Sequence, residues 1–298
     1  MTVRCRAVKI GVVMEIGDEG RGVAPYSEIR DLALQAESAG LDSIWVYDHL
    51  LYRVDGRTTG IHEGWTMLAA LAEATQRVEL GTLVVCTGFR NPALLAKMAA
   101  TLDHVSGGRL ILGLGAGWHD PEYEAFGYPT DHKVSRFEEA LVLICELIRT
   151  GRADMDGRWT TARDALLVPP ARPDIPILVA AFGPRMLELT ARHADAWNTA
   201  WYGLPDERMA DGRAALIGAC ERVGRDPAAI EVTSGVSVRY DGAAGSAPAL
   251  SGTPADVARG LRAHGDAGVD HLVAALEPIT AATLSEFAQA VDLYRASG

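Results

Sequence analysis

The sequence predicts a (β/α)8 barrel of the TIM type, an α/β fold, formed by a single domain that spans residues 1–298. Short apolar runs alternate with longer segments of helical periodicity from one end of the chain to the other. Eight such runs are present, and the length of 298 residues lies within the usual range of this barrel. An open doubly wound sheet is the alternative fold, and it would require about two of the expected strands to be absent.

The expected strands are near-continuous apolar runs, which is typical of strands buried on both faces of a parallel sheet. Residues 151–168, between the fourth and fifth strands, are expected to form an inserted loop or hairpin. No linker divides the chain, so all eight strands are assigned to one domain. In chain order they are Lys9–Met14, Ser43–Tyr47, Glu79–Val85, Leu110–Leu114, Ile177–Ala181, Ala196–Thr199, Ile230–Val238 and His271–Ala275.

Helices are expected between the strands, and two of them have a recognisable first turn. Ser135–Glu138 reads as a capping box, and Thr253–Asp256 places a proline directly after a threonine cap. Apolar residues at helical spacing are expected to face the core. Two such stripes are Leu94, Met98, Leu102 and Val105 after the third strand, and Leu284, Phe287, Val291 and Tyr294 near the end of the chain.

The composition excludes several classes of partner. The formal net charge is −11, and an acidic surface argues against nucleic acid or an anionic membrane. No apolar run is long enough for a signal peptide or a membrane span. The four cysteines lie far apart and form no C-x-x-C pair, so neither a zinc site nor a redox dithiol is expected. These features favour a reduced, cytoplasmic compartment.

The reactive residues of (β/α)8 barrels lie at the carboxyl ends of the strands. Asp48 and His49 directly follow the second expected strand and form an acid–imidazole pair. A histidine at this place can donate or accept a proton near neutral pH. A histidine that only hydrogen-bonds the loop backbone is the alternative interpretation.

Two further strand ends have features of a cofactor site. The segment Ala181–Arg185 leads from a strand into a helix, where free N–H groups favour an anion and the arginine can add a charged contact. The alternating glycines of Gly113–Gly117 leave space for a flat ring system. They do not match the dinucleotide fingerprint, because its third glycine would fall at Trp118. For Ala181–Arg185 the alternative is a plain turn from strand to helix. For Gly113–Gly117 the alternative is tight packing inside the barrel.

Other barrel chemistries lack the residues that they require. The chain has no His-x-His pair, and His62 and Glu63 lack the second histidine of a zinc-protease helix. Its lysines, at positions 9, 97 and 133, do not lie at a strand end where a Schiff base would form. Asp48 and Glu122 can be nominated for a glycosidase, but nothing singles them out. Elimination therefore favours an organic cofactor and no metal site.

Several segments at or near the strand ends occur together in the order of a known family. They are Trp45–His49, Leu80–Pro92, Ser106–Trp118, Pro176–Pro184 and Ala194–Asn198. On these segments the chain resembles the bacterial luciferase-like superfamily over nearly its whole length. Within that superfamily, the Asp-His pair and the run from Trp118 to Tyr123 are most similar to the oxidoreductases that depend on the deazaflavin coenzyme F420.

The resemblance implies a role for each of several residues. The third strand would end in a bulge with a non-prolyl cis peptide bond, Leu83–Val84, behind the cofactor ring. His49 would exchange a proton beside that ring. The other implied cofactor contacts are Asp48 and Cys86 at the ring, Ala116 and Gly117 further along it, and Phe182, Gly183, Arg185 and Met186 at the phosphate arm.

The chain also departs from part of that family. The sugar-phosphate dehydrogenases carry a glutamate where this chain has Trp118, and a tryptophan near the position of Arg53. The resemblance therefore does not support a glucose-6-phosphate type of activity, whereas the deazaflavin site can remain. Trp118 either replaces a catalytic acid as part of an apolar wall for a larger substrate or packs on the barrel rim.

Three functions follow as hypotheses. The first is hydride transfer between coenzyme F420 and a small organic substrate, with His49 exchanging the proton. The second is an FMN-dependent monooxygenase that uses molecular oxygen and needs a flavin reductase as partner. The third, of another class, is a flavin-binding or deazaflavin-binding protein without catalysis. The substrate pocket is expected in the loops 50–64, 119–133 and 239–252, and the resemblance suggests a homodimer.

Overall fold

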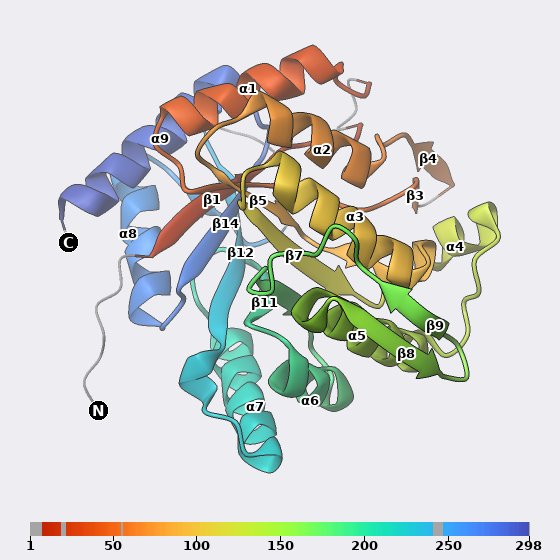
Figure 1. Ribbon diagram of the computed structural model, residues 1–298. Helices are drawn as coiled ribbons and strands as arrows, with labels where there is room; N and C mark the ends of the chain where they lie inside the picture. Colours follow the sequence, from red (N-terminus) through yellow and green to blue (C-terminus); the bar gives the residue numbers. More distant parts are fainter. Residues whose placement is uncertain (1–7, 19–21, 55, 241–246, 298) are drawn as a thin grey trace.

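The computed structural model describes residues 8–18, 22–54, 56–240 and 247–297. Within these residues eight parallel strands surround the centre of the molecule, and helices surround the strands (Figure 1). The strands follow one another around the barrel in chain order, and β1 pairs with β14 to complete the circle. They are β1 (Lys9–Val13), β2 (Ser43–Val46), β5 (Glu79–Thr82), β7 (Leu110–Gly115), β10 (Ile177–Ala180), β11 (Ala196–Tyr202), β12 (Glu231–Arg239) and β14 (His271–Leu276).

The predicted single-domain (β/α)8 barrel is confirmed, and the alternative open sheet is wrong. The decisive pairing is between β7 and β10, where Leu112 lies opposite Ile177 and Leu114 opposite Val179. This pairing continues the parallel sheet across the segment of residues 116–176, so the sheet has no break there. Most strands begin and end within one or two residues of the expected positions, because their apolar runs are buried on both faces.

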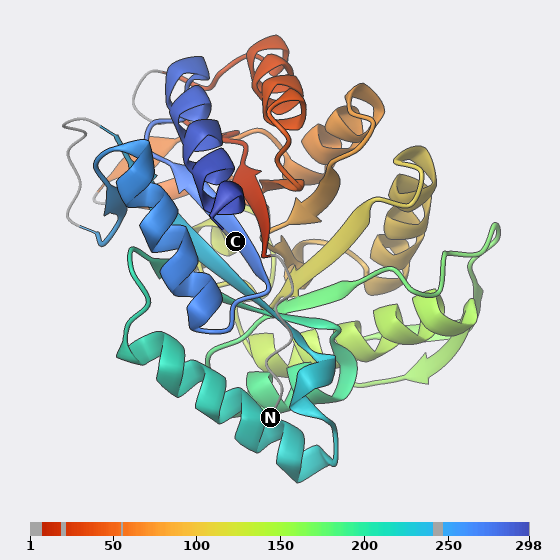
Figure 2. The same cartoon turned by 90° about the vertical axis from the view of Figure 1, so that its left-hand side faces the viewer.

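The helices alternate with the strands, and two views show them as an outer layer around the barrel (Figures 1 and 2). A short helix, α4, lies apart from this layer, at the side where β3 and β4 are also found (Figure 1). The helices are α1 (Tyr26–Ser38), α2 (Gly64–Ala74), α3 (Pro92–Val105), α4 (Asp120–Phe126), α5 (Lys133–Thr150), α6 (Pro184–His193), α7 (Glu207–Val223), α8 (Pro254–Asp266) and α9 (Ala281–Ala296).

Two expectations about the helices are wrong in detail. In α3 Leu102 is buried as predicted, but Leu95 is buried in place of Leu94, and Leu94 and Val105 are 54% and 50% exposed. The helix α5 begins at Lys133 with His132 as its N-cap, so Ser135 is inside the helix and forms no capping box. The predicted start of α8 and the predicted apolar stripe of α9 are confirmed, and Thr253 forms a capping box with Asp256.

The insertion at residues 151–168 is an antiparallel hairpin of β8 (Arg152–Asp156) and β9 (Thr161–Leu166), as expected. A second hairpin was not predicted. It consists of β3 (Tyr52–Val54) and β4 (Arg57–Thr59), and it follows β2 on the carboxyl side of the barrel. The remaining short elements are β6 (Val85–Cys86), β13 (Leu250–Ser251) and the 3-10 turns Thr87–Phe89 and Pro227–Ala229.

Inward-facing side chains fill the barrel with a small apolar cluster of its own. Trp45 is fully buried in this cluster, and Gly81 on the neighbouring strand leaves the space that its indole occupies. Leu83 and Val84 pack against the same cluster from the end of β5. The barrel interior below the mouth is therefore filled by side chains and is not an open channel. Within the described residues, no helix combines the length and the apolar character needed to cross a bilayer.

Candidate active site at the barrel mouth

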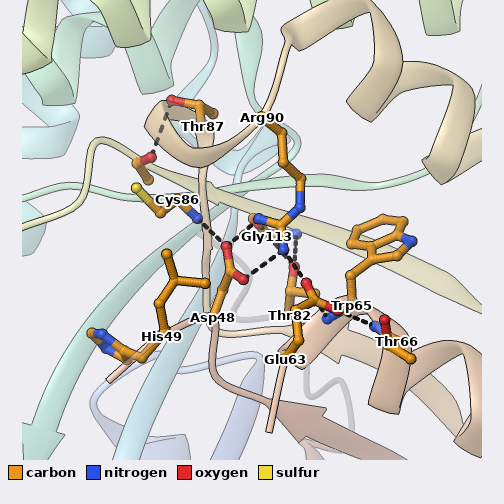
Figure 3. Close-up of polar contacts among 12 residues, drawn as sticks. Asp48, His49, Glu63, Trp65, Thr66, Thr82, Cys86, Thr87, Arg90 and Gly113 are labelled. Carbon is orange, nitrogen blue, oxygen red and sulfur yellow. Dashed lines mark hydrogen bonds and ion pairs between the residues drawn. The ribbon is translucent and has the colours of Figure 1, made fainter. Parts of the chain in front are cut away.

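Asp48 lies two residues after the end of β2 and is buried at the mouth of the barrel (Figure 3). Its carboxylate accepts a hydrogen bond of 2.8 Å from the backbone N–H of Cys86, and Arg90 donates to both of its oxygens at 2.6 and 2.8 Å. A two-pronged contact between guanidinium and carboxylate fixes both groups in one plane. Asp48 thereby fastens the end of the third barrel strand to the end of the second.

Arg90 is itself held by a second carboxylate, that of Glu63, which also caps α2 through the N–H of Thr66 at 2.7 Å. Burial alone would raise the pKa of Glu63, but the hydrogen bonds from Thr66 and the nearby Arg90 lower it below its usual value. The pair of carboxylates holds Arg90 in its charged form although burial acts against that charge, and the pKa of Arg90 is raised. This network supports the strand ends. Both oxygens of Asp48 accept hydrogen bonds within it.

His49 points away from the Asp48 network (Figure 3) and is paired with a different carboxylate. Its Nδ1 lies 2.9 Å from Oε1 of Glu122, whose other oxygen accepts the N–H of Leu50 at 2.8 Å. The side chains of His49 and Glu122 are only 13% and 2% exposed. Because a carboxylate accepts and does not donate, it favours the proton on Nδ1 and leaves Nε2 to exchange a proton.

Three more rings surround the His49 imidazole. Its centroid lies 4.4 Å from the ring of Tyr52 and 5.7 Å from that of Trp118, which meets it edge-on. His119 is buried next to Trp118, and its Nε2 accepts the backbone N–H of Arg53 at 3.1 Å. That bond joins the β3–β4 hairpin to the segment after β7. Two of the loops expected to form the substrate pocket therefore meet at His49.

Cys86 and Tyr123 form a buried pair beneath Gly117. The Cys86 Sγ lies 2.7 Å from the Tyr123 hydroxyl, which donates to the carbonyl of Ala116 at 2.8 Å. A hydroxyl has one proton, so the thiol is the donor in the first of these bonds. Burial raises the pKa of the Cys86 thiol to about 11, which keeps the proton on sulfur at neutral pH.

The thiol of Cys86 is expected to resist alkylation in the folded protein. The thiolate is the reactive form, and a pKa of about 11 leaves about one thousandth of the thiol ionised at pH 8. Iodoacetamide labelling of the Cys86 peptide, followed by mass spectrometry, should be slow at pH 8 and accelerate about tenfold per pH unit up to pH 10. The same peptide in urea-unfolded protein is the control and should label quickly. Fast labelling of the folded chain at pH 8 would contradict the buried pair.

Gly117 has a positive φ of 76°, and a Cβ there would lie 2.7 Å from the Cys86 sulfur and closer still to the Tyr123 hydroxyl. Gly127, at the end of α4, has a similar φ of 77° but nothing within 4 Å of such a Cβ. The variant Gly127→Ala should lose only about 1–2 kcal/mol of unfolding free energy, from the backbone conformation. Gly117→Ala should lose about 2–5 kcal/mol, because crowding adds to that cost. Urea unfolding of both variants measures the difference, and equal losses would contradict the crowding.

The bond Leu83–Val84 is a non-prolyl cis peptide, as the family resemblance implied. This bond separates β5 from the two-residue strand β6. The third barrel strand therefore ends at Thr82, whereas the sequence predicted its end at Val85. Both side chains are half-buried, and Gly115 on β7 makes room for Val84. A second non-prolyl cis peptide, Ala200–Trp201, was not predicted and coincides with the register shift in β11.

The residues predicted to hold the phosphate arm lie at the start of α6. Gly183 is the N-cap of that helix, and a glycine offers no side-chain oxygen to the free N–H groups of the first turn, those of Arg185 and Met186. Phe182 is 68% exposed, whereas Met186 is half-buried. The guanidinium of Arg185 is already paired with Glu138 and also donates to Ser135 at 3.1 Å. The backbone at this helix start, rather than the arginine side chain, is therefore the available anion site.

The structure brings some predicted residues together and keeps others apart. Asp48, Cys86, Ala116 and Gly117 form one connected group through the bonds of Cys86 and Tyr123. Phe182 and Gly183 follow β10, which neighbours β7 in the barrel. The cofactor contacts assigned to these residues stay predictions. The third expected pocket loop, 239–252, lies partly outside the described residues.

Sequence reasoning missed the partner of His49. The sequence nominates Glu122 only as one carboxylate of a glycosidase, whereas in the structure it bonds His49. It lies in the first turn of α4, three residues after His119. The start of that helix is signalled by Asp120 and Pro121, but nothing in the spacing shows that the helix folds back onto β2. In the described part of the chain, no group of three His, Cys, Asp or Glu side chains could hold a metal ion.

The barrel agrees with a comparison against known families. The chain belongs to the luciferase-like monooxygenase family, whose model matches residues 9–247. The family resemblance inferred from the strand ends is confirmed.

Relatives within this family carry more particular activities in their names. The phthiodiolone/phenolphthiodiolone dimycocerosates ketoreductase of Mycobacterium sp. (strain JLS) is 35% identical over 74% of this chain and 63% of its own. The F420-dependent glucose-6-phosphate dehydrogenase of Amycolatopsis mediterranei (strain U-32) is 34% identical over 57% of this chain and 52% of its own. The chain thus spans less than two thirds of the length of these curated relatives.

One solved structure shares the fold over nearly the whole chain. It is an F420-dependent secondary alcohol dehydrogenase in complex with an F420–acetone adduct, and it aligns with a TM-score of 0.83 and 18% identity. The alignment covers 97% of this chain and 99% of that one. At this identity the likeness concerns the barrel itself.

Proposed function

We propose that the protein is an oxidoreductase that transfers a hydride between coenzyme F420 and a small organic carbonyl or alcohol substrate. The observation that carries the proposal is the buried His49–Glu122 pair, a proton-exchange group at the mouth of a barrel that also contains the non-prolyl cis peptide Leu83–Val84. The names of the relatives support the same reaction class, because they include a ketoreductase and an F420-dependent dehydrogenase.

The residues at the mouth fit such a cofactor in two respects. The start of α6 offers N–H groups without an intrahelical acceptor, and a Cβ built on Gly183 would meet nothing within 4 Å, so an anionic group has both donors and space. Leu83 and Val84 present half-buried apolar side chains at the end of β5, suited to one face of a flat ring. Phe182, Gly183, Arg185 and Met186 would then hold the phosphate arm, and Ala116, Gly117 and Cys86 the region nearer the ring.

Bound reduced coenzyme F420 supplies the hydride in this scheme. The work of the chain is to place the substrate and to move a proton. Glu122 accepts from Nδ1 of His49 and so leaves Nε2 for proton exchange. The doubly protonated ring would give its Nε2 proton to a developing alkoxide, and the neutral ring would take a proton from an alcohol in the reverse direction. The rings of Tyr52 and Trp118 limit the access of water to the imidazole.

A cofactor titration tests the proposal. The purified protein is titrated with coenzyme F420 and with FMN, and binding is followed by fluorescence. We expect F420 to bind and to be consumed in its reduced form in the presence of a ketone. Tight FMN binding without F420 binding would reject the proposal in favour of the oxygen-dependent monooxygenase. Binding of F420 with no turnover across a panel of carbonyl and enone substrates would favour the non-catalytic protein.

We also propose that the protein is a homodimer, which light scattering checks.

A further inference from the structure

A cavity lies beside the ends of β6 and β7, where α3, α5 and the β8–β9 hairpin come together (Figure 1). Its volume is about 230 Å³. Pockets for drug-sized ligands usually enclose about 300–1,000 Å³, so this cavity suits a smaller molecule. None of the roles discussed above accounts for it.

The lining of this cavity is cationic, although the chain carries a formal net charge of −11. Among the described residues that line it, Arg90, Lys133 and Arg136 are positively charged and none is an aspartate or glutamate. Arg90 already donates to the carboxylates of Asp48 and Glu63. The charges that a ligand can use are therefore the two on α5. We call Lys133 and Arg136 the α5 cation pair.

Each member of the α5 cation pair is held against an aromatic ring that also lines the cavity. The Lys133 ammonium lies 4.1 Å from the centroid of the Tyr123 ring, and the Arg136 guanidinium lies 4.1 Å from that of Trp159. Such contacts attract a cation to the face of the ring. Tyr123 is itself buried and donates its hydroxyl to a backbone carbonyl. Both cations are therefore positioned before a ligand arrives, which lowers the entropic cost of binding.

The present partners of the α5 cation pair leave room for an anion. The two cationic side chains are only 16% and 27% exposed, whereas their carboxylate partners, Asp120 and Asp131, are 59% and 56% exposed. Asp120 accepts from Lys133, whose ammonium has three N–H groups. Asp131 accepts from Nε and Nη2 of Arg136, and Nη1 is the third nitrogen. Ion pairs with exposed carboxylates stabilise a protein little, so a ligand can compete with them.

The cavity and the predicted phosphate site lie on different sides of α5. The α5 cation pair and Ala140 have the i, i+3, i+7 spacing of one helical face, and that face lines the cavity. Arg185, at the start of α6, bonds Ser135 and Glu138 on the other side of the helix. In the described part of the chain, Ala116 is the one lining residue that is also a predicted cofactor contact. The cavity is therefore a second site and not an extension of the phosphate arm.

We propose that this cavity binds a small organic dianion at a site separate from the barrel mouth. Two cations on neighbouring turns of α5 match two negative charges, and charge-assisted hydrogen bonds to carboxylate or phosphate are the strong ones. A short dicarboxylate and a phosphate monoester both carry such a charge. The site goes beyond the proposed hydride transfer and does not depend on it.

Calorimetric titration of the protein without cofactor, at low salt, tests the proposal. The probes are succinate, glycerol 3-phosphate and, as the neutral control, glycerol. We expect the two anions to bind, glycerol not to bind, and the Kd of the anions to rise with added sodium chloride. Binding of either anion supports the site, and the tighter of the two indicates whether its natural ligand carries a carboxylate or a phosphate.

Variants of the α5 cation pair locate the bound anion. Lys133→Met and Arg136→Met remove a charge but keep a long side chain against the same aromatic ring, and each should raise the Kd at least about tenfold. Arg259→Met on α8 removes an arginine that is also paired with an exposed carboxylate, and this matched control should leave the Kd unchanged. Melting temperatures of the three variants confirm that each is folded.

The remaining outcomes decide against the site. If neither anion binds, or if glycerol binds as tightly as glycerol 3-phosphate, the proposal is wrong. An unchanged Kd in both α5 variants would reject it, because the anion would then bind elsewhere. Loss of anion binding in the presence of saturating F420 would make the cavity part of the cofactor site, whereas an unchanged Kd supports a separate site. If F420 itself does not bind, the proposed function fails, and the anion titrations still decide about the cavity.

Discussion

Replacing His49 by alanine is expected to lower kcat/KM for the proposed reduction at least about 100-fold, the lower range for the loss of a general acid–base group. The buried pair with Glu122 occupies Nδ1 and leaves Nε2 for proton exchange, and alanine offers nothing that moves a proton. The Kd of coenzyme F420, measured by fluorescence titration, should change less than about threefold, because the ring of His49 contacts Glu122, Tyr52 and Trp118 rather than the helix start of the phosphate arm.

His119→Ala provides the matched control for that variant. His119 belongs to the same group of rings, but its Nε2 accepts a backbone N–H of the β3–β4 hairpin and so serves to join two loops. Its loss should lower kcat/KM less than about tenfold. If His49→Ala retained turnover within tenfold of the unchanged protein, His49 would not be the proton-exchange residue, whatever the effect at His119.

The barrel could be predicted from the sequence because its signal is local and repeated. A strand buried on both faces needs an apolar run, and each run predicts its strand to within a few residues. Local patterns failed where a choice between adjacent residues depends on packing. The stripe of α3 fits Leu94 almost as well as Leu95, and only contact with the barrel decides that Leu95 faces inward.

The site was predictable to the extent that strand ends identify it. His49 and Asp48 follow from position, whereas the cis bond Leu83–Val84 came from family resemblance and from no physical property of those residues. Glu122 could not be assigned in advance, since its role depends on α4 folding back across the β3–β4 hairpin. That arrangement is fixed by contacts between residues more than 60 positions apart, such as Arg53 with His119.

Replacing Glu122 by glutamine is expected to lower kcat at least about tenfold while KM changes less than about threefold. The Glu122 carboxylate accepts two N–H groups, from His49 and from Leu50, and both of its oxygens are used. An amide has only one oxygen, so one of the two donors must face an NH2 group. The imidazole of His49 then loses its acceptor, or the Leu50 N–H loses its own and the side chain at position 122 is no longer held in place. Glu122 is a positioning residue in this account, because it acts on the substrate only through His49.

A spectroscopic readout distinguishes positioning from a loss of folding. In protein with 15N-labelled histidine, the neutral His49 ring should carry its proton on Nδ1 in the unchanged chain and become a mixture of both tautomers in Glu122→Gln. Glu124→Gln changes an exposed carboxylate on the same helix and should leave both kcat and the tautomer unaltered. If Glu122→Gln kept the Nδ1–H tautomer and full kcat, the buried carboxylate would be only a support for α4 and the Leu50 backbone. A fall in kcat that accompanies the tautomer change, at an unchanged melting temperature, would establish that the proton chemistry of His49 is set by Glu122 of α4.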